Sequence, residues 1–366
     1  MNNPRTLLVT GSTGSLGKEL LKTFLEKTSD QLLLLVRPKA HESQEKRVEK
    51  LLNKIGINGQ AAGRIRVLAG DVSEPRLGLN PADWDLAVRE TDEFYHSAAL
   101  THLGAARDEA EKINLRGTLN ALELAREAKA KGKLKRFFYF STAYVAGSLS
   151  PIHALEDVLP KNPVFSNAYE ATKFEAEGKV REAMAQGLPA TIFRPSIVVG
   201  DSETGAVSEF NVIYPFLRLF AHGLLRRVPA HPQHSFNIVP IDFVVEAAFH
   251  LARRPETLGK TFHLVTENPP TIKMLLEIKE EYGNFPPVEL VAPESFSTEN
   301  LDPEERAVFS ALHPYLGYLN GSLTFDTANT REALRGSAIS LPETGHAFLK
   351  KIVGYAIERG YFLRSA

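Results

Sequence analysis

Short apolar runs alternate with helical patterns along the first part of the chain, up to about Gly200. The apolar runs predict strands at Thr6 to Thr10, Leu32 to Val36, Ile65 to Ala69, Phe94 to Ser97, Arg136 to Ser141 and Thr191 to Arg194. The stretches between them predict helices near residues 15–27, 41–55, 105–130 and 166–187. Strands that alternate with helices are typical of βαβ units, in which helices cover both faces of a parallel sheet. The pattern therefore predicts an α/β fold with a doubly wound parallel sheet.

The pattern changes after residue 200, where prolines and short helical pieces dominate. Residues 237–250 and 261–265 are expected to return to the sheet as a late helix and a strand, and Pro269 and Pro270 mark the crossing that follows. We expect two parts: a nucleotide-binding domain of residues 1–200, completed by about 237–268, and a smaller, mostly helical substrate lobe of residues 201–236 and 269–366.

The first predicted strand ends in a glycine-rich turn, GSTGSLG at residues 11–17, and a helical pattern opens directly after it. Gly11 permits the tight turn, Gly14 lets the backbone approach a pyrophosphate, and Gly17 lets the helix pack against the strand. The helix N-terminus offers free N–H groups and a positive dipole end to the anion. An ordinary glycine-rich turn is the alternative, but the strand before and the helix after favour a Rossmann-type dinucleotide site.

Composition sets limits on the other classes of function. The chain of 366 residues is 43% hydrophobic and carries a net charge of -1, which points neither to nucleic acid nor to an anionic membrane. It has no cysteine, and its eleven histidines lack the spacing of metal ligands, so no metal site is expected. The predicted strand at Thr6 leaves no room for a signal peptide, and no apolar run approaches the ~18 residues of a membrane helix. We therefore expect a cytoplasmic protein without an integral membrane segment.

The second predicted strand ends in a basic segment with Arg37 and Lys39. NAD-dependent enzymes usually place Asp or Glu at this position, about twenty residues beyond the last glycine, to bind the ribose 2′-hydroxyl. A guanidinium instead suits a 2′-phosphate by charge and by bidentate geometry. A solvated basic loop is the alternative, but the pattern predicts NADPH or NADP rather than NADH.

Small and polar residues follow the next two strands. Asp71 is placed to accept a hydrogen bond from the adenine amino group, while Ser97, Ala98 and Ala99 would let the backbone approach the cofactor. Asn114 opens a helix nearby. Loops routinely carry such residues, so each signal is weak by itself.

A tyrosine and a lysine share one face of a predicted helix, because Tyr169 and Lys173 are four residues apart. The ammonium group is expected to lower the phenol pKa from its usual ~10, which suits proton transfer. Thr142 or Ser141, at the end of the fifth strand, can hold the substrate oxygen beside the phenol. An exposed helix face is the alternative for such a pair.

Seven segments occur together, in the order TGSTGSLG, LLVRPK, GDVSEPRLGL, HSAAL, STAYVAG, YEATK and FRPSIVVGDSETG. In this order they resemble an extended short-chain dehydrogenase/reductase. More narrowly, LLVRPK, the GD-to-LGL segment and RPSIVVGD resemble the thioester reductase and fatty acyl-CoA reductase branch, with its male-sterility-type NAD(P)-binding domain. The resemblance covers roughly residues 5–250.

The resemblance implies roles for residues at the matching positions. The pyrophosphate would be held by Gly11, Ser12, Thr13, Gly14, Ser15, Leu16 and Gly17. Arg37, with Lys39 beside it, would bind the 2′-phosphate, and the adenine would lie between Asp71 and Val72. The ribose side would be lined by Ser97, Ala98 and Ala99, and the nicotinamide by Pro195, Ser196 and Ile197. The catalytic trio would be Thr142, Tyr169 and Lys173. Lys173 would also bind the nicotinamide ribose, and Ala146 replaces a tyrosine of the family motif.

The leading interpretation is an NADPH-dependent reductase of acyl thioesters, giving an aldehyde and then, in some members of the branch, an alcohol. The thioester would come from coenzyme A or from an acyl or peptidyl carrier protein in trans, and the enzyme would be a monomer or homodimer. A dehydrogenase or epimerase of nucleotide sugars or hydroxysteroid-like rings is the alternative, because it uses the same trio. A non-catalytic NADP-sensing module fits the intact trio less well. The apolar stretch 205–225 would line an acyl channel or simply pack the smaller lobe.

Overall fold

The core of the fold is a seven-stranded sheet in which every paired strand is parallel. The computed structural model describes residues 4–39, 41–57, 59–147, 152–210, 212–283, 285–319 and 323–362. The strands are β1 (Thr6–Thr10), β2 (Gln31–Val36), β3 (Ile65–Ala69), β4 (Glu93–His96), β5 (Arg136–Phe140), β7 (Ala190–Pro195) and β11 (Thr261–Leu264). Their order is β11-β7-β5-β4-β1-β2-β3, so the winding reverses beside β1. The predicted doubly wound sheet is confirmed, and a ligand is expected beyond the carboxyl ends of β1 and β4.

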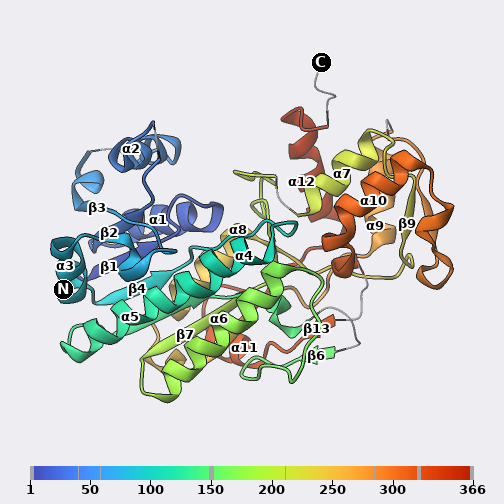
Figure 1. Ribbon diagram of the computed structural model, residues 1–366. Helices are drawn as coiled ribbons and strands as arrows, with labels where there is room; N and C mark the ends of the chain where they lie inside the picture. The colour runs from blue at the N-terminus through green and yellow to red at the C-terminus, as the bar shows by residue number, and fades with distance from the viewer. Residues whose placement is uncertain are drawn as a thin grey trace.

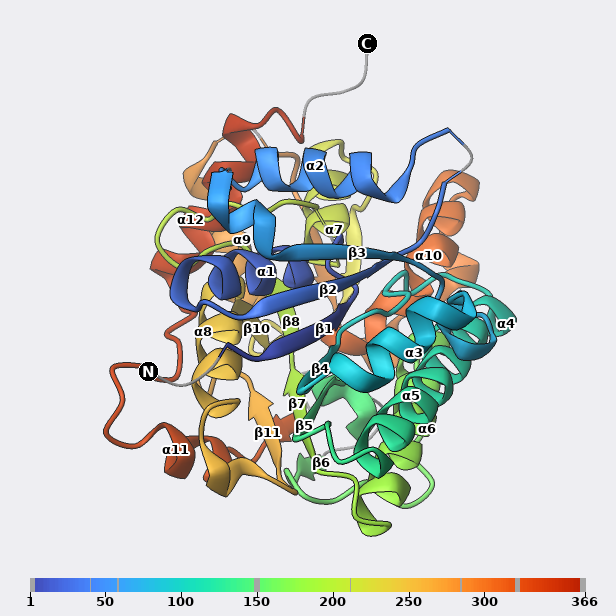
Figure 2. The same ribbon diagram turned by 90° about the vertical axis from the view of Figure 1, so that its left-hand side faces the viewer.

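Helices cover both faces of this sheet (Figure 2). One buried cluster joins the sheet to α1 (Ser15–Lys27), α2 (Gln44–Lys54) and α8 (Ile241–Leu251). The other joins it to α3 (Pro81–Glu90), α5 (Gly117–Ala130) and α6 (Ala168–Ala185). Because both faces are covered, the strands are apolar along their length rather than alternating, which is why they were predictable.

Three of the six helices just named begin at a side-chain cap. Ser43, Asn80 and Asn167 accept hydrogen bonds from backbone N–H groups in the first turn of α2, α3 and α6. Such caps satisfy donors that the helix itself leaves free. Helix α3 was not among the predicted helices, although Asn80 followed by Pro81 is a typical start signal.

The structure divides the predicted helix 105–130 into three segments. It consists of α4 (Arg107–Ala110), a π-helical segment η3 (Glu111–Arg116) and α5. Likewise, the predicted late helix at 237–250 is preceded by a strand, since residues Ile238–Pro240 pair with another short strand and α8 begins at Ile241. A π-helical segment inserts an extra residue into a turn, and apolar periodicity does not reveal it.

A third cluster of buried apolar side chains unites four more helices. These helices lie beside the sheet (Figure 1). These are α7 (Ile213–Ala221), α9 (Ile272–Glu281), α10 (Pro303–Leu316) and α12 (His346–Glu358), and α11 (Ala328–Leu334) packs near β11. Three two-stranded parallel pairs accompany them: β8 (Ile197–Val199) with β10 (Ile238–Pro240), β9 (Arg227–Pro229) with β12 (Glu289–Val291), and β6 (Ile152–Ala154) with β13 (Leu323–Phe325).

Short 3-10 helices complete the chain at η1 (Gly59–Arg64), η2 (Pro75–Gly78), η4 (Ala143–Ala146), η5 (Pro255–Thr257), η6 (Pro293–Ser295), η7 (Thr298–Asn300) and η8 (Gly317–Leu319). None of the helices in the described part of the chain is long and apolar enough to cross a membrane.

Candidate active site

The glycine turn after β1 is packed too tightly for side chains at two of its glycines. Gly11 has a φ of +78°, and a Cβ added there would lie 2.6 Å from the backbone nitrogen of Ala98. A Cβ on Gly17 would lie 2.1 Å from the carbonyl oxygen of Gly11. The Gly14 backbone nitrogen donates to that same oxygen at 2.9 Å, which closes the turn. The backbone at the N-terminus of α1 is therefore open to an anion, as a dinucleotide pyrophosphate requires.

A cavity of about 320 Å³ opens in front of this turn. The predicted site residues that line it are Gly11, Gly14, Ser15, Leu16, Gly17, Ser97, Ala99, Thr142, Tyr169, Lys173, Pro195, Ser196 and Ile197. They come from the ends of β1, β4, β5 and β7 and from α6, segments far apart in the sequence. Within the described residues, the buried hydroxyl of Ser196, which lines the cavity, has no hydrogen-bond partner, so a polar ligand there would satisfy it. Ser12, Thr13 and Ala98 do not line the cavity itself.

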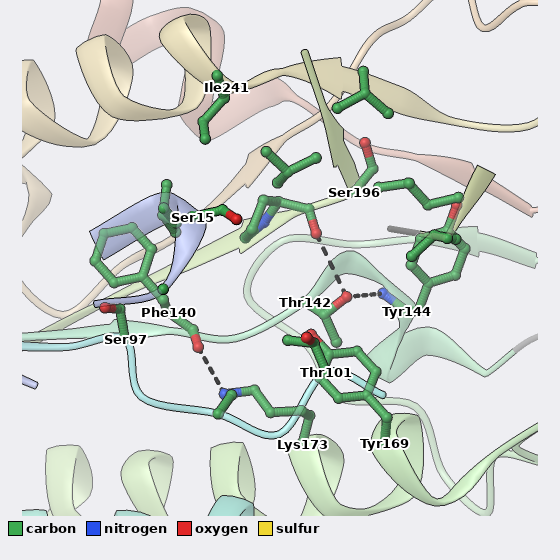
Figure 3. A pocket seen from close by; sticks show the side chains of 18 of the residues that line it. Ser15, Ser97, Thr101, Phe140, Thr142, Tyr144, Tyr169, Lys173, Ser196 and Ile241 are labelled. Carbon is green, nitrogen blue, oxygen red and sulfur yellow. Dashed lines mark hydrogen bonds between the residues drawn. The ribbon is translucent and has the colours of Figure 1, made fainter. Parts of the chain in front are cut away.

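The predicted catalytic trio meets at one wall of this cavity (Figure 3). Thr142 is the N-cap residue of η4, where its Oγ1 accepts from the Tyr144 nitrogen at 3.3 Å and donates to the Pro195 carbonyl at 3.5 Å. The Tyr169 ring rises from α6 toward Thr142, while Lys173 Nζ donates to the Phe140 carbonyl at 2.7 Å. The Lys173 ammonium also lies 4.2 Å from the centre of the Tyr139 ring, and cation–π attraction favours that position. Two hydroxyls and an ammonium group therefore face one space.

The acid–base properties of the trio differ from the expectation. Burial raises the pKa of Tyr169 to about 12, and the hydrogen bond with Thr142 opposes this only in part. Burial lowers the pKa of Lys173 to about 7, while Glu177 acts in the opposite direction. The predicted lowering of the phenol pKa by Lys173 is therefore not what the structure gives. Loss of hydration outweighs the helical spacing, and the ammonium is directed toward the main chain of β5.

The residues predicted to bind adenosine lie outside the cavity, at the ends of β2 and β3. Arg37 Nε lies 3.9 Å from Asp71 Oδ2, and the Arg37 side chain is 59% exposed. Asp71 also accepts from the backbone nitrogen of Ser73 at 2.9 Å. Val72 contacts the backbone of Gly117, where an added Cβ would lie 3.1 Å away, and Lys39 is exposed. The structure thus brings Arg37 and Asp71 together on the far side of the glycine turn from the trio.

The π-helical segment η3 gives Asn114 a structural task. Its Oδ1 accepts from the Leu100 nitrogen at 2.7 Å, and its Nδ2 donates to Thr172 Oγ1 at 3.0 Å. Asn114 therefore ties the loop after β4 to α6, the helix that carries Tyr169 and Lys173. π-Helical turns often occur at functional sites, and this one positions two walls of the cavity.

Sequence reasoning missed several residues that line the cavity, among them Thr101, Leu103, Tyr144 and Tyr318. The cavity is also lined by Val207, Glu209 and Val212, which belong to the stretch 205–225 that was expected to line an acyl channel or to pack the smaller lobe. Ser208 Oγ donates to Ser15 Oγ at 3.0 Å, which joins this stretch to the N-terminus of α1. Val212 has a φ of +48°, a strained conformation for a β-branched residue. No local motif marks these positions, because they come together only in the folded chain.

A second, narrow cavity of about 30 Å³ lies beside the first, and Ile197, Val212 and Tyr318 line both. The remaining side chains that line it are Ile213, Phe216, Phe220, Val228, Phe236, Ile272, Leu275, Leu276, Leu290 and Tyr315. Part of the predicted apolar stretch 205–225 therefore lines a cavity and packs the buried cluster at the same time. Among the described residues, no group of three or more His, Asp or Glu side chains could hold a metal ion.

Known proteins resemble this chain over most of its length. It is 27% identical over 365 residues to the large subunit of the L-2-aminoadipate reductase of Penicillium chrysogenum, which covers 91% of this chain and 25% of that protein. It is 29% identical over 290 residues to the carboxylic acid reductase of Mycobacterium tuberculosis, covering 71% of this chain and 24% of that enzyme. The chain thus spans about a quarter of the length of these two relatives.

The fold matches a solved domain closely. The terminal R domain from the myxalamid PKS-NRPS biosynthetic pathway superposes with a TM-score of 0.83 at 27% identity, covering 100% of this chain and 93% of that one. This agreement confirms the predicted extended short-chain dehydrogenase/reductase fold. The family described as male sterility protein, an NAD-binding family, matches residues 9–248, more than half of the chain. The chain therefore belongs to the male sterility protein family of NAD(P)-dependent oxidoreductases.

Proposed function

We propose that this chain is an NADPH-dependent reductase that converts an acyl thioester into its aldehyde. The observation that carries the proposal is that a polar cavity and an apolar cavity lie side by side. The polar cavity joins the glycine turn to Thr142, Tyr169 and Lys173, and it shares Ile197, Val212 and Tyr318 with the apolar cavity. The names of a carboxylic acid reductase and of an R domain among the similar proteins support the same class of reaction.

Side chains of the polar cavity would bind the cofactor and stabilise the charge that develops on the substrate oxygen. A nicotinamide dinucleotide held by the glycine turn, Ser196 and Lys173 supplies the hydride. Tyr169 donates a hydrogen bond to the thioester carbonyl oxygen, and the Thr142 hydroxyl adds a second one when it exchanges its long bond to the Pro195 carbonyl for the substrate. These donors matter because they stabilise negative charge that develops only in the transition state, by about 2.7–4 kcal/mol per donor in oxyanion holes.

Proton transfer then completes the reduction. Because its pKa is about 12, Tyr169 carries its proton at neutral pH and gives it to the oxygen as the carbonyl carbon gains the hydride. The product is a hemithioacetal. It collapses when the hydroxyl proton returns to the Tyr169 phenolate and the carbon–sulfur bond breaks, and the leaving thiolate takes a proton from solvent, which gives the aldehyde and a free thiol. No covalent bond to the enzyme is needed, in keeping with a chain that has no cysteine.

Two further features support a specific cofactor and substrate. Arg37, exposed at the end of β2 beside Asp71, offers a guanidinium to a 2′-phosphate, which favours NADPH over NADH. The second cavity is narrow and lined by aliphatic and aromatic side chains, so an acyl tail that widens it on binding would be unbranched and apolar. We assign residues 201–236 and 269–366 to the substrate lobe for this reason. The thiol would be that of a carrier protein in trans or of coenzyme A. A cytoplasmic location and the oligomeric state stay predictions.

The direct test follows NADPH consumption with short, medium and long acyl-CoAs and with acyl carrier-protein thioesters, with products identified by mass spectrometry. We expect one aldehyde for each NADPH consumed when the product is trapped. The Tyr169→Phe variant, which keeps the ring and loses the proton, is the matched control and should be nearly inactive. Turnover of a nucleotide sugar or a cyclic alcohol, with no reaction of any thioester, would refute the proposal.

A further inference from the structure

Helix α6 carries a third polar residue on the face of the catalytic pair. Glu177 follows Lys173 by four residues and Tyr169 by eight, so the three lie in one row along the helix. The Glu177 side chain is 0% exposed. A buried carboxylate is costly unless charged partners and hydrogen bonds surround it, so its partners indicate its role.

Two arginines hold Glu177. Arg194, at the end of β7 and itself 1% exposed, donates from Nη2 to Oε1 at 2.6 Å and from Nε to Oε2 at 3.0 Å. Arg181, one turn further along α6, donates from Nε to Oε1 at 2.8 Å. Arg194 also donates to the carbonyls of Leu155 and Val158, which fixes its guanidinium from the other side. The guanidinium groups of Arg194 and Arg181 therefore share the Glu177 carboxylate. Lys173 is a third cationic side chain, one turn before Glu177 on α6.

Among the titratable groups that the structure describes around Lys173, Glu177 is the one that carries a negative charge, and it acts on the ammonium without a direct hydrogen bond. From β5, Lys173 contacts the ring of Tyr139, whose pKa burial raises, so that this phenol keeps its proton. From β4 it acts on His96, a buried imidazole whose pKa burial and Lys173 lower to about 3. On α6 it has Tyr169 on one side and Glu177 on the other. Glu177 raises the pKa of Lys173 against the larger effect of burial.

We propose that Glu177 is a positioning residue that keeps Lys173 charged at the cavity wall, and that Arg181 limits how strongly it does so. The inference rests on the proposed role of the Tyr169 and Lys173 pair. An arginine that neutralises a carboxylate weakens its attraction for a neighbouring cation. The same three residues could instead serve only to anchor α6 on β7, and the two interpretations predict different results.

The test compares two substitutions with opposite electrostatic effects. Glu177→Gln removes the negative charge and should move the loss of activity at high pH to lower pH, by about one pH unit or more. Arg181→Gln leaves the Glu177 and Arg194 pair in place, frees more of the carboxylate charge and should move the same limb to higher pH. Glu182→Gln, an exposed substitution on the same helix, is the matched control and should move nothing.

Binding of NADPH, measured by its fluorescence between pH 6 and 9 without substrate, provides a readout independent of turnover. The dissociation constant of NADPH should rise with pH as Lys173 loses its proton. The midpoint of this rise should shift in each variant in the same direction as the midpoint of the activity loss. Opposite shifts in the two variants support the proposal, even if no thioester is ever reduced. Shifts in one direction or no shift, together with lower melting temperatures, would show that the cluster is only an anchor. If Glu177→Gln does not fold, an unshifted binding limb in Arg181→Gln alone overturns the proposal.

Discussion

Two glycines of the turn after β1, Gly17 and Gly14, differ in the space around them. We therefore expect an alanine at one of them to affect stability and an alanine at the other to affect NADPH binding. At Gly17, which lies inside α1, an added Cβ would lie 2.1 Å from the Gly11 carbonyl oxygen and 2.8 Å from Ser12 Cα. These are backbone atoms, so α1 would have to move away from β1. At Gly14, which has a φ of −78°, the nearest atom is the same oxygen at 3.4 Å, an ordinary contact.

The expected effects follow from these distances. Gly17→Ala should lower the free energy of unfolding by about 1–3 kcal/mol, because overpacking costs more than the ~0.5–1 kcal/mol that alanine gains over glycine in a helix. Gly14→Ala should leave stability unchanged or raise it by about 0.4–1 kcal/mol through the unfolded chain. Its methyl group would nevertheless stand where the backbone must approach a pyrophosphate. We expect it to weaken NADPH binding about tenfold, which corresponds to ~1.4 kcal/mol.

Thermal unfolding and NADPH fluorescence titration measure the two effects separately. The reasoning predicts a variant that is stable but binds poorly, Gly14→Ala, and a variant that is destabilised, Gly17→Ala. Normal NADPH affinity in Gly14→Ala would show that the pyrophosphate does not lie on this turn. Normal stability in Gly17→Ala would show that α1 and β1 are not packed as the structure has them.

Other parts of the site give four further predictions. Arg37→Asp should weaken NADPH binding by about ten- to a hundred-fold, or ~1.5–3 kcal/mol, and spare NADH; equal affinities of the unmutated protein for both cofactors would contradict the assignment. Tyr169→Phe should reduce turnover about 10²–10⁴-fold with cofactor affinity retained, and a near-normal rate would reject Tyr169 as the acid. Each methylene of an acyl chain that enters the apolar cavity should raise kcat/KM about fourfold, from ~0.8 kcal/mol, until the cavity is full, and Leu275→Trp should remove this dependence for long chains only. Burial raises the pKa of Glu177, but Arg194 outweighs it and brings that pKa down to about 2. The ionised carboxylate therefore stabilises the fold above pH ~4.5, and this stability is lost as the pH falls toward 2. Acid unfolding curves of the Arg194→Met variant should lack this step.

Those parts of the structure that a short stretch of sequence determines were predictable. All six strands predicted before residue 200 are present, because a strand buried on both faces needs only a continuous apolar run. The glycine turn and the Tyr169 and Lys173 spacing are local patterns too, and the structure places both on one cavity. Their functional roles stay predictions until the variants above are measured.

The rest depends on contacts between distant segments. Strand β13 pairs with β6 through residues such as Leu323 and Ile152, and three-residue strands carry no periodicity that would reveal them. The same holds for Val212 and Tyr318, which lie more than one hundred residues apart and line both cavities. Substrate specificity would reside in this wall, so the sequence identifies the reaction class more readily than the acyl chain.

The pKa values of Tyr169 and Lys173 bear on the direction of the reaction. A phenol with a pKa of about 12 is ionised in on the order of one molecule in a hundred thousand at pH 7. An acid that must keep its proton until the oxyanion forms is well served by this, whereas oxidation of an alcohol would need the phenolate as base. Lys173, with its pKa of about 7, is then the member of the pair that titrates in the neutral range. The burial that contradicts the simple expectation from helical spacing therefore keeps the phenol protonated at neutral pH, and it places control of the pH dependence on the lysine and on the charges around it.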